Sequence, residues 1–187
     1  RDTPAVSSLM RLITVFSALG ATYLTLMPVM ARDSLGLDAG GYGALLSCVG
    51  IGGFAGALSL AAVGDRVRRG QLVFMASFAY ATALLVLSIV RTAALAYPVL
   101  LAAGFTMIVS NAVGNATLQR VVPNELRGRM MAAYSFISVG MSQVLGSLIG
   151  GSVAHATGVL WAIGGGAGIL LAYTFWAFRH SPELRAV

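Results

Sequence analysis

The feature of this sequence that most limits its fold is a series of long runs without a charged residue. Such runs cover residues 12–31, 39–64, 70–90, 92–119 and 130–178, each bounded by arginine or aspartate. A helix rises about 1.5 Å per residue, so about 20 residues cross the hydrocarbon core of a bilayer. A β-barrel would instead alternate apolar and polar residues in segments of about ten. The runs are continuously apolar and therefore predict transmembrane helices.

The last run is too long for one crossing, and a polar turn, His-Ala-Thr-Gly at 155–158, interrupts it. Dividing it there gives six predicted spans, at about 12–31, 42–63, 71–90, 93–118, 130–153 and 159–178. The chain is 58% hydrophobic and 10% charged, whereas soluble domains carry about 25% charged residues. The predicted fold class is all-α, a polytopic membrane protein with six transmembrane helices.

The distribution of arginine predicts the orientation of these spans, because cytoplasmic loops carry an excess of basic residues. Two arginines, Arg32 and Arg91, fall on one side of the predicted membrane, and ten fall on the other. The ten are Arg1, Arg11, Arg66, Arg68, Arg69, Arg120, Arg127, Arg129, Arg179 and Arg185. We therefore predict that both termini are cytoplasmic. Such loops account for the net charge of +6, so no nucleic acid partner is expected.

Glycine pairs in the second and fifth predicted spans point to close helix packing. Gly52 and Gly56 have the spacing at which small residues let two membrane helices approach, and Gly146 and Gly150 repeat it. The pairs favour either tight static packing or surfaces that slide during a conformational cycle. The two spans cross in opposite directions and share a weak pattern, Gly-x5-Gly-Ala/Ser-Leu. This predicts two inverted three-helix repeats, an arrangement found in several secondary transporters.

Two predicted cytoplasmic loops carry most of the charge. In the loop at 64–70, Asp65 can pair with a neighbouring arginine or sit at the N-terminus of another helix, where unpaired N–H groups favour an anion. In the loop at 119–129, we expect Pro123 to stop the helix, Asn124 to cap the next one and Glu125 to lie in its first turn. If Asp65 sits at the N-terminus of another helix, it would latch one group of helices against another.

The same loops carry a family resemblance. Asp65, Arg66 and Arg69 match the loop signature of the major facilitator superfamily, Gly-x-x-x-Asp-Arg-x-Gly-Arg-Arg, although Ala61 and Arg68 stand where it has glycine. The stretch at 119–129, Gln-Arg-Val-Val-Pro-Asn-Glu-Leu-Arg-Gly-Arg, resembles the loop between the tenth and eleventh helices of enterobactin exporter-like and macrolide-efflux-like members. Residues 27–36 and 41–46 resemble the end of the seventh helix and the start of the eighth.

This resemblance runs along essentially the whole chain. It implies that residues 1–187 form the C-terminal six-helix half of a twelve-helix transporter in a bacterial cytoplasmic (inner) membrane. It also implies a central cavity between the halves, lined here by the first, second, fourth and fifth spans. Polar residues inside a span are costly unless they face protein or water. The candidates to line this cavity are Tyr23, Asn111, Asn115, Tyr134 and Gln143. Hydrogen bonding between helices is the alternative role for the asparagines and Gln143.

The function that the resemblance implies is secondary active transport of small molecules. We expect an exporter of drug-like compounds or siderophores that works by alternating access, as an antiporter with protons as a candidate coupling ion. Its partners would be the lipid bilayer, the small-molecule substrate, and an N-terminal half or a second copy. Gating or latching would fall to loop residues: Asp65, Arg66, Arg69, Glu125, Arg127 and Arg129. No cofactor, metal or catalytic residue is expected.

Two other classes of membrane protein fit the sequence less well. An intramembrane protease of six helices needs a Gly-x-Ser-Gly nucleophile and a histidine in the membrane. That motif is absent, and the two histidines, His155 and His180, lie in an outer turn and in the tail. The permease subunit of an ATP-driven transporter needs a long cytoplasmic coupling segment, and the loop at 119–129 is too short for it.

Overall fold

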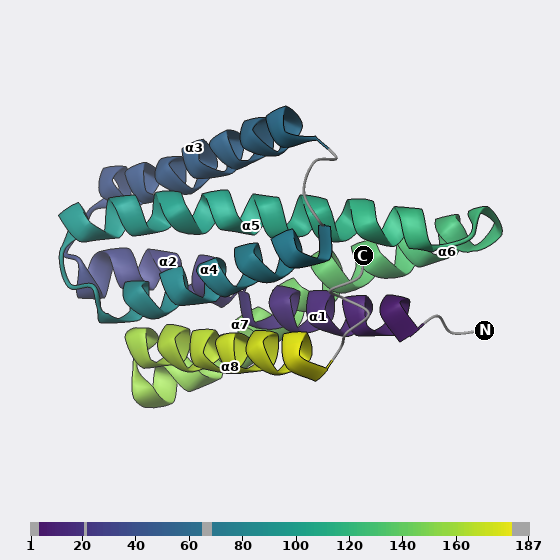
Figure 1. Cartoon of the computed structure of the whole chain (residues 1–187). Coiled ribbons are helices and arrows are strands. Elements are labelled where there is room, and N and C mark those ends of the chain that lie inside the picture. The colour runs from purple at the N-terminus through teal and green to yellow at the C-terminus, as the bar shows by residue number, and fades with distance from the viewer. Residues whose placement is uncertain (1–3, 21, 65–68, 181–187) are drawn as a thin grey trace.

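The chain is helical throughout the part that the structure describes. This computed structural model describes residues 4–20, 22–64 and 69–180. The helices are α1 (Pro4–Gly20), α2 (Thr22–Val29), the π-helix η1 (Met30–Ser34), α3 (Ala39–Val63), α4 (Arg69–Ile89), α5 (Ala93–Val121), α6 (Asn124–Ser135), the π-helix η2 (Phe136–Met141), α7 (Ser142–Thr157) and α8 (Val159–His180). Figure 1 shows the α2–α3, α4–α5 and α7–α8 turns at one end of the molecule and the α5–α6 turn at the other. The all-α prediction is confirmed.

Five helical stretches of the described residues are long and apolar enough to cross a membrane. They are Met10–Ser34, Ala39–Val63, Arg69–Ile89, Ala93–Arg120 and Val159–His180. They coincide with five of the six predicted spans, and every predicted boundary lies within three residues of the observed one. The predicted break in the last apolar run is also found, because α7 ends at Thr157 and α8 begins at Val159. Between them Gly158 has a φ of 96°, which residues with a side chain rarely adopt.

The remaining predicted span, 130–153, is not among these five. Residues 124–157 follow a helical path through α6, η2 and α7. The π-helix η2 lies inside the predicted span, and its wider hydrogen-bonding pattern interrupts the α-helix there. Six crossings therefore stay a prediction, although the backbone of this segment is helical throughout.

The connection from α5 to α6 follows most of the local expectations. α5 ends at Val121 and α6 begins at Asn124, so Pro123 stops the helix as predicted. Glu125 lies in the first turn of α6, also as predicted. The expectation that Asn124 caps α6 is wrong, because Pro123 holds the N-cap position and Asn124 is already helical. Proline can take this place because it has no N–H to leave unpaired.

The first apolar stretch, Met10–Ser34, is tied to α4 at Gly20. The Tyr80 hydroxyl on α4 donates a hydrogen bond of 2.7 Å to the Gly20 carbonyl. A Cβ at Gly20 would lie 2.8 Å from a Tyr80 ring carbon, so the ring packs directly on the glycine. This stretch is irregular after Pro28, where the chain continues as the π-helix η1. Proline removes one backbone hydrogen bond, which accounts for a disturbed helix here.

Glycine sets the closest helix contact, between α3 and α5. A Cβ added at Gly52 would lie 2.0 Å from the Leu101 carbonyl oxygen, and one at Gly56 would lie 2.7 Å from that of Phe105. From the other helix, a Cβ at Gly104 would lie 2.1 Å from the Val49 carbonyl oxygen. The two backbones are therefore in direct contact. The tight packing predicted for Gly52 and Gly56 is confirmed.

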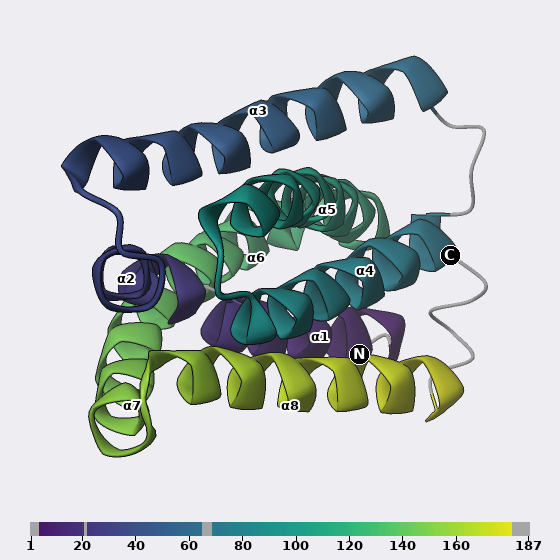
Figure 2. The ribbon, with the colours of Figure 1, turned by 90° about the vertical axis from the view of Figure 1, so that its left-hand side faces the viewer.

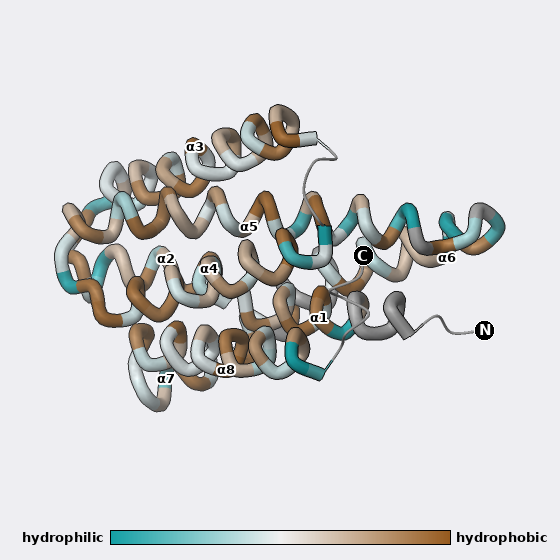
Figure 3. Tube along the Cα trace, viewed as in Figure 1, coloured by the Kyte–Doolittle hydropathy of each residue, from teal (hydrophilic) through white to brown (hydrophobic). Residues whose placement is uncertain are grey.

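The order of the helices across the bundle is the same in two perpendicular views. α3 lies along one edge, α7 and α8 lie along the opposite edge, and α4 and α5 lie between them (Figures 1 and 2). Apolar residues cover the middle of the helices, and hydrophilic ones gather toward the turns at both ends (Figure 3). Large apolar side chains remain exposed on the outside, among them Phe54 at 68% and Trp161 at 75%. Such exposure suits a surface in contact with lipid.

Two glycines two residues apart on α3 test the packing. A Cβ at Gly52 meets the backbone of α5, whereas one at Gly50 has nothing within 4 Å. We predict that Gly52→Ala lowers the free energy of unfolding by about 1–3 kcal/mol, the usual cost of overpacking. Gly50→Ala should leave it unchanged within about 0.5 kcal/mol. Unfolding of both variants in mixed micelles measures the difference, and equal stability would contradict the backbone contact.

Candidate functional site

The polar side chains of α5 form the first part of the candidate site. Asn111 and Asn115 are both half-buried and lie one turn apart, as the sequence predicts. The Asn115 side-chain oxygen accepts a hydrogen bond from the amide of Gln119, one turn further on. This bond lies within one helix, so it orients the Asn115 amide without joining α5 to a neighbour. Three amide side chains, at 111, 115 and 119, thus follow one another along the end of α5.

Tyr134 joins this row of amides from α6. Its side chain is 8% exposed and lies within hydrogen-bonding reach of the side chains of Asn115 and Ser138. Its ring packs in a small apolar cluster with Ile13, Leu118 and Val122. The structure therefore brings two of the predicted cavity residues, Asn115 and Tyr134, into one polar group. Asn111 lies a turn away on the same helix.

Tyr23 lies elsewhere, in the centre of the bundle. It is 1% exposed and belongs to the main apolar core. Its ring meets the Tyr80 ring edge-on, with centroids 6.2 Å apart, and Tyr80 in turn packs against Phe16. The Tyr23 hydroxyl lies close to the Tyr80 side chain but makes no well-aligned hydrogen bond within the described residues. A buried hydroxyl without a well-aligned partner is costly, so a polar group or water would be stabilised at this point, near Gly20.

Gln143 is placed by its backbone only. It lies in the first turn of α7, directly after η2, and its side chain lies outside what the structure describes. Its membership of the cavity stays a prediction.

The predicted latch residues fall into two groups. Asp65 and Arg66 lie outside the described residues. Arg69 begins α4 and lines a hollow of about 370 Å³ together with Arg120, the last basic residue of α5. Glu125, Arg127 and Arg129 are exposed on α6. Arg69 is therefore the latch residue that the structure places in a cavity.

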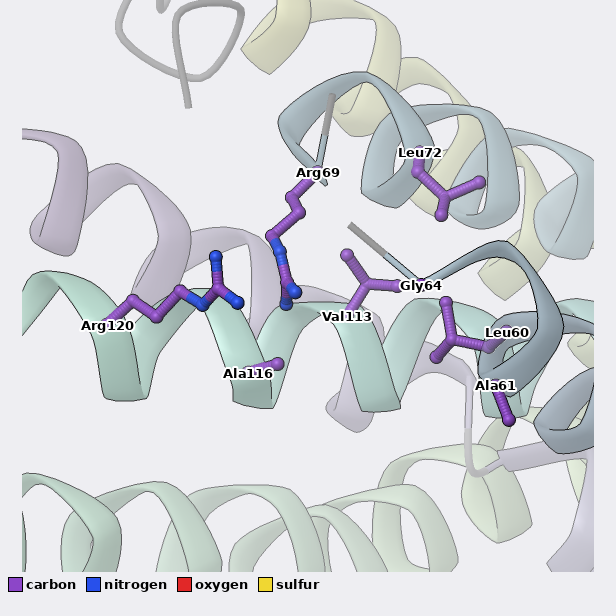
Figure 4. A pocket seen from close by; sticks show the side chains of 8 residues that line it. All are labelled: Leu60, Ala61, Gly64, Arg69, Leu72, Val113, Ala116 and Arg120. Carbon is purple, nitrogen blue, oxygen red and sulfur yellow. The ribbon is translucent and has the colours of Figure 1, made fainter. Parts of the chain in front are cut away.

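Figure 4 shows this hollow from close by. The side chains of Arg69 and Arg120 extend toward one another across the face of α5 at Ala116. Its other walls come from the end of α3, the start of α4 and the middle of α5. Two guanidinium groups in one hollow repel each other and favour an acidic group nearby.

Sequence analysis missed three residues of these sites: Gln119, Arg120 and Tyr80. Gln119 and Arg120 were assigned to a loop, but α5 continues to Val121 and carries both. The spacing of four between Asn115 and Gln119 could have shown that their side chains meet on a helix. Tyr80 carries no local sign of its role, because its partners Gly20 and Tyr23 lie far away in the sequence. Across the described residues, no cluster of histidine, cysteine, aspartate and glutamate could hold a metal ion.

Comparison with known proteins identifies a family to which the chain is similar. Residues 2–186 match the family described as transmembrane secretion effector, which is of the major facilitator type. No curated protein and no solved structure matched the chain. The match covers almost every residue, and its members are membrane transporters of the exporting kind. This chain therefore belongs to the transmembrane secretion effector family and is a multi-pass membrane protein with a small-molecule substrate.

Proposed function

We propose that this chain is the C-terminal six-helix half of a twelve-helix secondary transporter, which exports a small molecule by alternating access. The family match over residues 2–186 is the observation that carries this proposal. Drug-like compounds or siderophores are the proposed substrate class, and protons are the proposed coupling ion. The membrane would be the bacterial cytoplasmic (inner) membrane, with both termini on the cytoplasmic side.

The packing of the helices supports two inverted three-helix repeats. α3 packs against α5, and α7 packs against α1 and α2. Likewise α4 packs against α5, and α8 packs against α1 and α2, while α4 and α8 pack against each other. Suppose that α1 and α2 are exchanged with α5, α3 with α7, and α4 with α8. The contacts of α3 and α4 with α5 then become the contacts of α7 and α8 with α1 and α2, and the α4–α8 contact is unchanged. The exchange is incomplete, because α7 packs more closely on α8 than α3 does on α4.

The glycine pairs of the two proposed repeats make corresponding contacts. Gly52 and Gly56 approach the backbone of α5. In the other repeat, a Cβ at Gly150 would lie 2.3 Å from a methyl group of Thr22, and one at Gly146 would lie 3.5 Å from its backbone nitrogen. Each glycine pair thus meets the corresponding helix of the opposite repeat. The contact at Gly146 is looser, which favours this side for movement during the transport cycle.

A polar group made by Asn115, Gln119 and Tyr134 is the part of this half that we propose faces substrate. Asn115 is half-buried and Gln119 is exposed, so both are open to a ligand. Amides and a phenol offer donors and acceptors without charge, which suits drug-like molecules. Asn111 and Gln143 are proposed to extend the same surface, with Tyr23 further inside the bundle.

We propose that the hollow with Arg69 and Arg120 is where the cytoplasmic latch acts. Asp65, four residues before Arg69, is the proposed anion, and Arg66, Glu125, Arg127 and Arg129 would set the charge around it. Closing the latch would hold one of the two access states. Its opening would let the helices of this half move against the missing half.

The role of the polar group can be tested by export from cells. We predict that Asn115→Leu slows ethidium efflux about tenfold, because it removes hydrogen bonds worth about 0.5–1.5 kcal/mol each. The control is Thr106→Val on the same helix. Thr106 bonds back to the Ala102 carbonyl and lies about 180° around the helix from Asn115. Equal efflux by both variants at equal membrane levels would contradict the proposed substrate surface.

The proposed orientation can be tested by labelling single cysteines. The free Cys48 is first replaced by serine. We predict that a membrane-impermeant maleimide labels Thr157→Cys, in the turn between α7 and α8, in intact spheroplasts. Gly128→Cys, on α6 at the opposite end, should be labelled only after permeabilisation, because the arginine-rich side is cytoplasmic. The reverse pattern would overturn the orientation.

A further inference from the structure

We infer a phospholipid site between α4 and α8, selective for a headgroup that carries both a phosphate and an ammonium group. The inference rests on the proposed membrane placement. Two neighbouring hollows share Arg91, Leu160 and Trp161. They lie at the end of the bundle where the arginine-poor turns gather, and Figures 1 and 2 both place the end of α4 beside the start of α8.

The first hollow, of about 370 Å³, has a mostly apolar lining, as a groove for an acyl chain would. Its walls are Leu85 and Ile89 of α4 and Leu160 and Trp161 of α8. Gly164 and Gly165 also line it. A Cβ at Gly164 would lie 2.8 Å from the Ser88 hydroxyl oxygen, whereas Gly165 is exposed and a Cβ there would have nothing within 4 Å, so a large side chain at 165 has room to extend over the hollow. Besides Arg91, which both hollows share, Ser88 is polar, and it donates its hydroxyl hydrogen to the Leu85 carbonyl at 2.7 Å. The groove is therefore mostly apolar and open.

The second hollow, of about 390 Å³, is polar and lies at the helix ends. Asp33 and Ser34 of η1, Arg91, and Gly158 at the start of α8 line it. Arg91 and Asp33 form no ion pair with each other in the described structure, since the ion pair at Asp33 is with Arg32. That pair is exposed, with side chains 86% and 54% accessible, so Asp33 loses little by exchanging it for another cation.

Together the hollows match the two parts of a lipid molecule. Arg91 would bind the phosphate as a charge-assisted donor, and Asp33 would accept from the ammonium group. An acyl chain would continue into the groove past Trp161, whose ring prefers the boundary between headgroups and hydrocarbon. A headgroup with net negative charge would meet Asp33, and choline lacks N–H groups to donate. Phosphatidylethanolamine is the probe that fits both side chains.

The test uses Trp161 as a reporter inside the site. Trp176→Phe leaves Trp161 as the sole tryptophan. The full chain is reconstituted in phosphatidylcholine nanodiscs with increasing fractions of phosphatidylethanolamine brominated on its acyl chains. We predict quenching that corresponds to about two- to fivefold preference over brominated phosphatidylcholine, the range that exposed charge pairs give. Brominated phosphatidylglycerol should show no such preference.

Variants separate the site from general lipid contact. Arg91→Gln and Asp33→Asn should each remove the preference, whereas Arg32→Gln, which leaves Asp33 available, should retain it. Gly165→Leu should remove it by extending over the groove. Gly168→Leu is the matched control on the same helix, because a Cβ there also has nothing within 4 Å and the residue lines neither hollow.

The quenching test distinguishes a failure of the proposed lipid site from a failure of the proposed membrane placement. Equal quenching of Trp161 by all three brominated lipids would overturn the site and leave the membrane placement standing. A Trp161 that none of them quenches would overturn both. A preference that survives Arg91→Gln and Asp33→Asn would also contradict the site.

Discussion

The contact on which the rest of the structure depends is the approach of two helix backbones at glycine. In a bilayer no hydrophobic force drives helices together, so association relies on close van der Waals packing and on hydrogen bonds. Gly52, Gly56 and Gly104 bring α3 and α5 so close that no side chain fits between them. α5 also packs against α4, and α4 packs against α8. The polar side chains near the end of α5 therefore keep their positions because this helix is held from both sides.

Hydrogen bonds between helices add specific connections to this packing. The hydroxyls of Ser77 and Ser110 share a buried bond of 2.7 Å between α4 and α5. The Tyr80 hydroxyl on α4 donates to the Gly20 carbonyl in the first apolar stretch. Most other hydroxyls bond back to their own helix, as Thr117 does to Val113. The part of the bundle that the structure describes is therefore held by packing together with polar connections at Ser77–Ser110 and Tyr80–Gly20.

The sequence predicts the helices better than it predicts their irregularities. Five apolar spans and the turn at Gly158 follow from run length and composition, which are local properties. The π-helix η1 follows Pro28, a local signal that run length does not use, and no pattern in the runs marks η2. The cavity candidates were chosen as polar residues in spans, and their role stays a prediction. That Asn115 meets Tyr134 while Tyr23 lies in the core depends on helix rotation, which polarity alone does not determine. Asp65 and Arg66 lie outside the described residues.

The central claim, that this chain is half of a twelve-helix transporter, is tested most directly by the intact mass of the native gene product taken from its own membranes. The account predicts a mass of about twice the 19.3 kDa of this chain, because a six-helix half would provide only one wall of the proposed central cavity. A native product of 19.3 kDa that transports as a monomer in liposomes would contradict it.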